Sequence, residues 1–249
     1  ETYCIVCIRC CLERTKIMAD FTFAHREEGF DEHIDKSIRG YADLLDDVIS
    51  LSRYFVEDAT NVYDIGCSTG KLTQRMLEAN QDFCAEANYV GIEIADGFYD
   101  DILRRQAHIN EIHPWASVDL RHEDVRNTSL ENASLVTSIF TLQFMSKKDR
   151  RETIQRIYDS LNEGGAFIFS EKVVCENANF QDMLTFNFYD FKRKTFDTED
   201  IMDKERTLRS MLKPSTWTEI REMMWDAGFN EVQPFWQNHM FVGGICIKN

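Results

Sequence analysis

Hydrophobic residues recur with the period of a helix in some stretches of the chain and form short continuous runs in others. From 31 to 56, apolar residues recur at helical spacing, and the next apolar run, at 61–65, has the length of a buried strand. Helical stretches and strand-length apolar runs then continue to alternate. Strands are predicted at 61–65, 89–94, 118–122, 134–140 and 166–170, and helices at 71–80, 98–111 and 149–161. This alternation indicates βαβ units and a mainly parallel sheet.

The alternation ends after the fifth strand. A long polar block with a helical pattern follows at 177–212. A further helix and two closing strands are predicted at 217–228, 232–237 and 241–247. Just before the fifth strand, the residues 162–165 (Asn-Glu-Gly-Gly) predict a helix stop with glycine in the left-handed conformation. No internal repeat or linker divides 18–249, so we expect one domain with an inserted helical segment.

The first seventeen residues differ in composition from the rest. Cys4, Cys7 and Cys10 have a spacing that could hold zinc or an iron–sulfur cluster. A separated fourth ligand is missing, because Cys11 directly follows Cys10. We therefore expect residues 1–17 to form a disordered, Cys-rich extension that binds no metal, upstream of a normal sequence that begins at Met18.

Charge narrows the classes of partner. The chain has 43 acidic and 28 basic residues, a net charge of −15. This balance disfavours direct binding of nucleic acids, whose phosphates require many Lys and Arg residues, and adsorption to anionic membranes. No apolar run approaches the roughly 18 residues that span a bilayer. The eight cysteines are not needed to staple a chain this long, which predicts a reducing, cytoplasmic location.

A glycine-rich turn between the first strand and its helix is the first chemical signal. It reads Asp64-x-Gly66-x-Ser68-x-Gly70. Glycines let the backbone turn sharply and approach a ligand, and the N-terminus of the following helix offers free N–H groups. We therefore expect a ligand to lie on this turn.

Two acidic residues are placed to complete such a site. Glu93 ends the second predicted strand, where a carboxylate can accept hydrogen bonds from both ribose hydroxyls. Asp124 follows the third strand, where an adenine edge would lie. Ligands of open α/β sheets bind at these carboxyl ends of the strands.

Several kinds of site share this pattern. A dinucleotide fold has Gly-x-Gly-x-x-Gly, but here the third glycine comes too early, at Gly70. The pentad also matches the nucleophile elbow of hydrolases, with Ser68 as nucleophile and His239 as a late candidate base. A turn without a ligand is a further alternative. A class I S-adenosylmethionine fold expects an acid two residues before the first glycine, Gly-x-Ser, and an acid after the second strand, and the chain has all three.

The fold class expected is therefore α/β. It is a Rossmann-like, seven-stranded, mostly parallel sheet of the class I methyltransferase type, with N-terminal helices and a helical insertion after the fifth strand.

Longer stretches of the chain resemble one family, the carboxy-S-adenosyl-L-methionine synthases. The similarity runs from about Phe21 to Ile247. The stretches that carry it are Phe21-Thr22-Phe23, Ser37-Ile38-Arg39-Gly40-Tyr41, Val62-Tyr63-Asp64-Ile65-Gly66-Cys67-Ser68, Glu131-Asn132-Ala133-Ser134, Phe140-Thr141-Leu142-Gln143-Phe144, Ser170-Glu171-Lys172, Asp190-Phe191-Lys192-Arg193 and Ala227-Gly228-Phe229. The resemblance implies an enzyme that converts S-adenosylmethionine and prephenate to carboxy-S-adenosylmethionine and phenylpyruvate, for modification of a tRNA wobble uridine by a partner enzyme.

The resemblance also implies a set of site residues. Contacts to S-adenosylmethionine or its carboxylated form would come from Tyr41, Gly66, Cys67, Ser68, Glu93, Ile94, Asp124, Val125 and Ile139. The catalytic residue would be Arg206, which in a homodimer would enter the site of the other subunit and meet a carboxylate. No metal is implied.

The chain departs from the family pattern at two of these positions. The family commonly has Asp where this chain has Glu93, which is a conservative change, and Asn where it has Ile139. Ile139 removes one polar contact, and this favours a first alternative, an ordinary methyltransferase acting on a small molecule. A second alternative is a binder of S-adenosylmethionine without catalysis.

Overall fold

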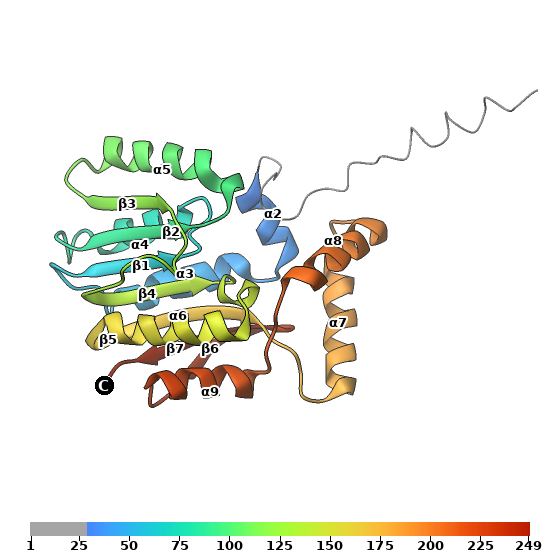
Figure 1. Cartoon of the computed structure of the whole chain (residues 1–249). Coiled ribbons are helices and arrows are strands. Elements are labelled where there is room, and N and C mark those ends of the chain that lie inside the picture. Colours follow the sequence, from blue (N-terminus) through green and yellow to red (C-terminus); the bar gives the residue numbers. More distant parts are fainter. Residues whose placement is uncertain (1–28) are drawn as a thin grey trace, which may run out of the picture.

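The computed structural model describes residues 29–249 (Figure 1). Its strands are β1 (Asn61–Ile65), β2 (Asn88–Glu93), β3 (Ser117–His122), β4 (Ala133–Ile139), β5 (Leu161–Lys172), β6 (Gln233–Asn238) and β7 (Phe241–Ile247). They form one seven-stranded sheet in the order β3-β2-β1-β4-β5-β7-β6. The first five strands pair in parallel, and β7 runs antiparallel to both neighbours. The predicted fold class is confirmed.

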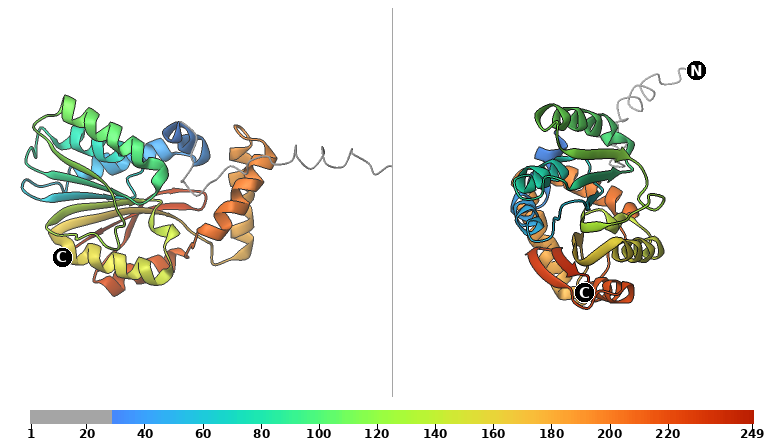
Figure 2. Two further views of the ribbon diagram at one scale, coloured as in Figure 1. Left: turned by 45° about the horizontal axis from the view of Figure 1, so that its top comes forward. Right: turned by 90° about the vertical axis from the view of Figure 1, so that its left-hand side faces the viewer.

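Helices cover both faces of the sheet (Figure 2). They are α2 (Phe30–Ser37), α3 (Tyr41–Ser52), α4 (Lys71–Asn80), α5 (Tyr99–Ile112), α6 (Lys147–Ser160), α7 (Ala178–Lys192), α8 (Thr198–Met211) and α9 (Trp217–Ala227), with short 3-10 turns η1 (Asp96–Phe98) and η2 (Leu142–Phe144). Apolar residues of α6 and α9 pack on one face, and those of α3, α4 and α7 on the other. Burial of both faces explains why β1, β2 and β4 are largely apolar, whereas in β3, at the sheet edge, apolar residues alternate with exposed polar residues.

The helical pattern predicted at 31–56 corresponds to two helices, α2 and α3, in agreement with the N-terminal helices of the predicted fold class. Ile38 is extended, with φ −125° and ψ 113°, and Gly40 is left-handed, with φ +75°. A Cβ on Gly40 would lie 3.3 Å from Nδ2 of Asn238. The apolar period continues across this break, so the period alone does not reveal it.

The helix predicted to end at Leu161 does end within one residue of it, but the glycines of 162–165 are not its stop. Helix α6 ends at Ser160, and Leu161 already has extended backbone, with φ −69° and ψ 139°. Gly164 is left-handed, with φ +81°, but it lies inside β5, where the register with β4 shifts. The glycines therefore form a bulge in a long strand and do not end the helix.

The helical insertion predicted after the fifth strand consists of α7 and α8. Each begins at a side-chain cap, Asn177 for α7 and Asp197 for α8. The two helices stand together at the end of the sheet where β5 leads into α7, on the same side as α2 (Figures 1 and 2). Lys204 of α8 approaches His33 of α2, with 2.5 Å between Nζ and Nε2.

Two further findings bear on the sequence-based predictions. Among the described residues no helix is long and apolar enough to cross a membrane. The predictions for 1–17, for Met18 and for the stretch Phe21-Thr22-Phe23 lie outside the described residues.

Candidate functional site

The glycine-rich turn lies at the point of the sheet where the strand order reverses. Strand β1 is flanked by β2 and β4, so the turn after β1 opens at the topological switch point, the usual ligand position in this architecture. Gly66 has φ +76°, and a Cβ there would lie 2.0 Å from Oγ1 of Thr141 in the loop after β4. Only glycine allows these two loops to meet so closely. The backbone N–H of Gly66 also donates to the Ile92 carbonyl, at 2.7 Å.

Glu93 at the end of β2 holds this turn in place. Its Oε2 accepts from the backbone N–H of Ser68 at 2.9 Å, and its Oε1 from that of Ala95 at 2.8 Å. Ser68 has φ +47°, an uncommon conformation for a residue with a side chain, and the hydrogen bond stabilises it. Glu93 is 6% exposed, and burial raises the pKa of its carboxyl group. Each carboxylate oxygen keeps a second lone pair for a ribose hydroxyl.

Asp64, two residues before Gly66, stabilises the start of the turn by hydrogen bonds. Its carboxylate accepts from the hydroxyls of Thr73 on α4, at 2.7 Å, and of Thr137 on β4, at 3.0 Å. Burial raises the pKa of Asp64 to about 6, although both threonine bonds oppose the rise. The acid two residues before the first glycine therefore joins β1, α4 and β4, and its role toward the ligand is indirect.

Asp124, Val125 and Ile94 form the neighbouring wall. The carboxylate of Asp124 accepts from Nε and Nη2 of Arg126, at 2.9 and 2.6 Å, and these bonds lower its pKa. Val125 is buried, and its carbonyl accepts from Arg156 at 2.7 Å. Ile94 directly follows β2 and is exposed. Since β2 and β3 pair through Glu93 and His122, these residues gather at one edge of the sheet.

Tyr41 and Ile139 lie next to the loop that follows β4. Tyr41 begins α3, and its ring stacks on Phe140 with 6.1 Å between ring centres. Burial raises the pKa of the Tyr41 hydroxyl. Ile139 ends β4 and packs against the apolar cluster of α3 and α4. The position that was expected to lack a polar contact is therefore an apolar wall.

Comparison with known proteins identifies this arrangement. The family model described as a methyltransferase domain matches residues 63–167. A carboxy-S-adenosyl-L-methionine synthase of Staphylococcus epidermidis is 36% identical over 220 residues, which are 88% of this chain and 92% of that protein. One from Shewanella baltica is 31% identical over 236 residues, 93% of this chain and 94% of that protein. The chain belongs to the carboxy-S-adenosyl-L-methionine synthase family.

Solved structures support the fold of this family member. A magnesium protoporphyrin IX methyltransferase from Synechocystis, solved with bound SAH, aligns with a TM-score of 0.57 over 92% of this chain and 91% of that one, at 13% identity. An O-methyltransferase family protein from Burkholderia thailandensis gives 0.60 over 91% and 61%, at 17% identity. These structures bear on the fold alone. Membership of the family makes the protein a transferase that uses S-adenosylmethionine, as predicted from the sequence.

The structure does not bring Arg206 to the other predicted site residues within one chain. It lies on α8, its side chain is 77% exposed, and its Nη1 pairs with Oδ1 of Asp203 at 2.9 Å. A family member that used Arg206 in its own site would need it to face the turn. Its assignment to the site of a second subunit stays a prediction.

The hydrolase alternative finds no support in the geometry. The backbone of Ser68 bonds to Glu93, and His239 packs against the rings of Phe188 and Phe191. Neither ring nitrogen of His239 has a hydrogen-bond partner among the described residues. A nucleophile elbow requires its serine and histidine to be bonded to each other.

One contact to the turn was not foreseen. Asp31 of α2 accepts from the hydroxyl of Thr69 at 3.0 Å, and its carboxylate lies 3.9 Å from Nη2 of Arg105 on α5. The carboxylate thereby joins α2 to the turn and to α5. A helical pattern surrounds Asp31, but no local signal shows that this face of the helix meets a turn 38 residues away.

Proposed function

We propose that the protein is a carboxy-S-adenosyl-L-methionine synthase, which converts S-adenosylmethionine and prephenate to carboxy-S-adenosylmethionine and phenylpyruvate. The observation that carries this proposal is the similarity to relatives of that name over about nine-tenths of the chain. The turn at Gly66, with Glu93 beside it, supports it because it has the shape and polarity that an adenosyl ligand needs.

The proposed reaction balances without a metal. Prephenate becomes aromatic by losing CO2 and hydroxide, which leaves phenylpyruvate. The hydroxide removes a proton from the sulfonium methyl group and becomes water. The resulting ylide attacks CO2 and forms the carboxymethyl sulfonium. The positive sulfur makes the methyl group acidic enough for this step, so the protein chiefly positions the reactants and excludes water.

Individual residues would share this work. Glu93 would bind the ribose hydroxyls, and the backbone from Gly66 to Ser68 would approach the ligand. Asp124 and Val125 would border the adenine. Arg206 would pair with the new carboxylate, because its planar guanidinium donates two parallel hydrogen bonds.

A homodimer would let Arg206 reach that carboxylate. The exposed position of Arg206 suits a residue that enters the site of a second subunit. An apolar stripe on the neighbouring helix α7 also suits an interface: Phe180, Met183 and Phe186 are 61%, 65% and 62% exposed. The product would serve tRNA modification by another enzyme in the cytoplasm. The net charge of −15 argues against direct contact with tRNA.

Mass spectrometry of the reaction tests the proposal. Purified protein is incubated with S-adenosylmethionine and prephenate. The expected product is heavier than S-adenosylmethionine by one CO2, and phenylpyruvate should appear in equal amount. Prephenate labelled with carbon-13 in its ring carboxyl should pass that label to the sulfonium product. Unlabelled product, or none, would refute the proposal.

Ile139 favours a second candidate, an ordinary methyltransferase. The apolar side chain at the end of β4 offers no hydrogen bond to a carboxylate near the donor. Such an enzyme would form S-adenosylhomocysteine from S-adenosylmethionine and a small acceptor without prephenate. Measuring S-adenosylhomocysteine with and without prephenate separates the two reactions.

A further inference from the structure

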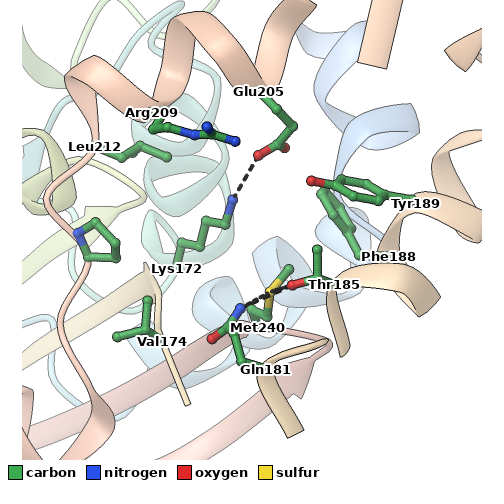
Figure 3. Close-up of a pocket in the computed structure, with 11 residues that line it drawn as sticks. Lys172, Val174, Gln181, Thr185, Phe188, Tyr189, Glu205, Arg209, Leu212 and Met240 are labelled. Carbon is green, nitrogen blue, oxygen red and sulfur yellow. Dashed lines mark hydrogen bonds and ion pairs between the residues drawn. The ribbon is translucent and has the colours of Figure 1, made fainter. Parts of the chain in front are cut away.

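A second feature of the same edge of the sheet is a pocket of about 340 Å³ between the end of β5, α7 and α8 (Figure 3). It falls at the lower end of the volumes typical of small-molecule sites. Figure 3 shows Lys172 and Arg209 on one side, with Glu205 beside them. The lining residues are Lys172, Val174, Gln181, Thr185, Phe188, Tyr189, Glu205, Arg209, Leu212, Pro214 and Met240. Cations thus meet an apolar and aromatic wall.

Positive charges gather around one ring of this pocket. The ammonium groups of Lys172 and Lys192 lie 5.8 and 5.1 Å from the ring centre of Phe188. Lys192 is 3% exposed, which is rare for a lysine. Burial lowers its pKa and the charge of Lys172 lowers it further, whereas Glu205 opposes the shift.

Glu205 offsets only part of this charge. It lies 3.6 Å from the ammonium of Lys172, and both side chains are less than one-fifth exposed. Lys172, Lys192 and Arg209 therefore stand against one carboxylate among the described residues around the pocket. A dianionic ligand would balance them, and a cationic ligand would be repelled.

Short contacts connect the pocket to the glycine turn. The backbone N–H of Lys172 donates to Oε1 of Gln143 at 2.7 Å. Gln143 lies in η2, two residues after Thr141, whose side chain faces Gly66. The pocket and the turn thus share the loop after β4.

We propose that this pocket binds the co-substrate, a dicarboxylate whose apolar carbon ring contacts Phe188 and Tyr189 and whose carboxylates pair with Lys172 and Arg209. Lys192, whose ammonium lies 5.1 Å from the ring centre of Phe188, adds positive charge. This inference rests on the proposed function, and it names the residues that would hold the carboxylate donor. A monocarboxylate product would leave one cation unpaired and bind less tightly.

Substitutions that remove a cation and a substitution that removes the carboxylate should change the KM for prephenate in opposite directions, and this tests the pocket. Lys172→Met and Arg209→Gln each remove a cation, and we expect the KM for prephenate to rise about tenfold or more, as for loss of a hydrogen bond to a charged group. Glu205→Gln removes the opposing carboxylate, and the KM should fall. Lys148→Met is the matched control, because that exposed lysine pairs with Glu152 on α6. The Kd for S-adenosylmethionine should stay the same in all four.

The outcomes separate the pocket from misfolding. A merely structural role would raise the KM in the Glu205→Gln variant as well, and would weaken S-adenosylmethionine binding. Either result would overturn the pocket, as would an unchanged KM in both cation variants. The double variant Lys172→Met with Glu205→Gln should recover part of the affinity that Lys172→Met loses, since it no longer leaves an unpaired carboxylate.

Calorimetry separates failure of the pocket from failure of the proposed function. Prephenate is titrated into protein saturated with S-adenosylhomocysteine, so that no turnover is needed. Binding by the unaltered protein that Lys172→Met weakens about tenfold or more supports the pocket, even if no carboxylated product forms. Absence of binding, or equal binding by the Lys172→Met variant, overturns the pocket even if the carboxylated product is made.

Discussion

At the scale of single residues, the glycine turn depends on one missing side chain. Gly66→Ala would place a methyl group 2.0 Å from Thr141 in a left-handed conformation. We expect a loss of about 2–5 kcal/mol in the free energy of unfolding, from strain and overpacking together, and no measurable donor binding. Chemical denaturation and calorimetry measure the two effects.

Gly164→Ala is the matched control for that substitution. Gly164 is also left-handed, with φ +81°, but nothing lies within 4 Å of its Cβ position. Gly164→Ala should lower the free energy of unfolding by about 1 kcal/mol, from backbone strain alone. It should leave donor binding intact. Equal losses in the two variants would show that crowding against Thr141 is not what Gly66 avoids.

Glu93 is the residue whose loss should act most directly on the ligand. Glu93→Ala frees the backbone N–H groups of Ser68 and Ala95 and removes the carboxylate that we propose as acceptor for both ribose hydroxyls. The Kd for S-adenosylmethionine should rise about tenfold to a hundredfold, as expected for hydrogen bonds to a charged group. Asp96→Ala, a change to an exposed carboxylate nearby, is the control. An unchanged Kd would remove Glu93 from the site.

Asp64 should make stability depend on pH. Burial raises its pKa from 3.8 to about 6, so the folded chain holds a proton that the unfolded chain has already lost. The contribution of this group to stability is therefore full below pH 3.8 and is lost as the pH rises to about 6.

Asp64→Asn removes that dependence. The unfolding free energy of the variant, relative to the unaltered chain, should increase by about 2–3 kcal/mol between pH 4 and pH 7. Urea denaturation at both values measures it. Asp46→Asn, an exposed carboxylate on α3, should show no such trend. A constant difference across this range would mean that Asp64 is charged in the folded chain throughout.

At the scale of elements, the strands and their order of appearance could be predicted from the sequence. The prediction at 118–122 and the observed β3, Ser117–His122, differ by one residue. The strands β1, β2 and β4 are short, largely buried and followed by a turn, so their limits are local, whereas β5 extends five residues before its predicted start. The break at Gly40 was missed because the helical period continues across it, and the bulge at Gly164 was taken for a helix end because both use left-handed glycine.

The same distinction between local and distant signals applies to the site. Gly66 and Glu93 could be predicted because each follows directly from a strand end. The pocket beside them could not be predicted, because its lining residues Lys172 and Arg209 come from β5 and α8, and Lys192 beside Phe188 comes from α7. Their convergence depends on how α7 and α8 return to the sheet, and no spacing in the sequence encodes that return.

Helix α7 gives an element-scale test of self-association. If its apolar stripe is the dimer interface, replacing Phe180 and Phe186 together by Ser should give monomers in sedimentation velocity. The fold should be unaffected, because both side chains are exposed. Tyr54→Ser changes an aromatic residue beyond α3 that is even more exposed, at 80%, and should leave the dimer intact. A dimer that survives the double change must use another face.

At the scale of the whole molecule, the position of Arg206 raises the question of which subunit it serves. Its guanidinium is exposed and pairs with Asp203 on its own helix. A carboxylate formed on the sulfonium carbon needs a cation, because a charge left unpaired in a poorly hydrated site is costly. Arg206→Ala should weaken binding of carboxy-S-adenosylmethionine by about 2–5 kcal/mol. The affinity for S-adenosylmethionine, which lacks that group, should barely change.

Mixed dimers decide whether Arg206 acts across the interface. Subunits with Arg206→Ala are combined with subunits that carry Glu93→Ala. If Arg206 serves the other subunit, one site of each mixed dimer has both lesions and the other has neither, so part of the carboxylating activity returns. If Arg206 serves its own subunit, every site has one lesion and the mixture stays inactive. Arg206→Lys should restore only part of the affinity, since a point charge cannot replace the bidentate guanidinium. Equal loss of affinity for both ligands in Arg206→Ala would contradict a role at the carboxylate and favour the ordinary methyltransferase.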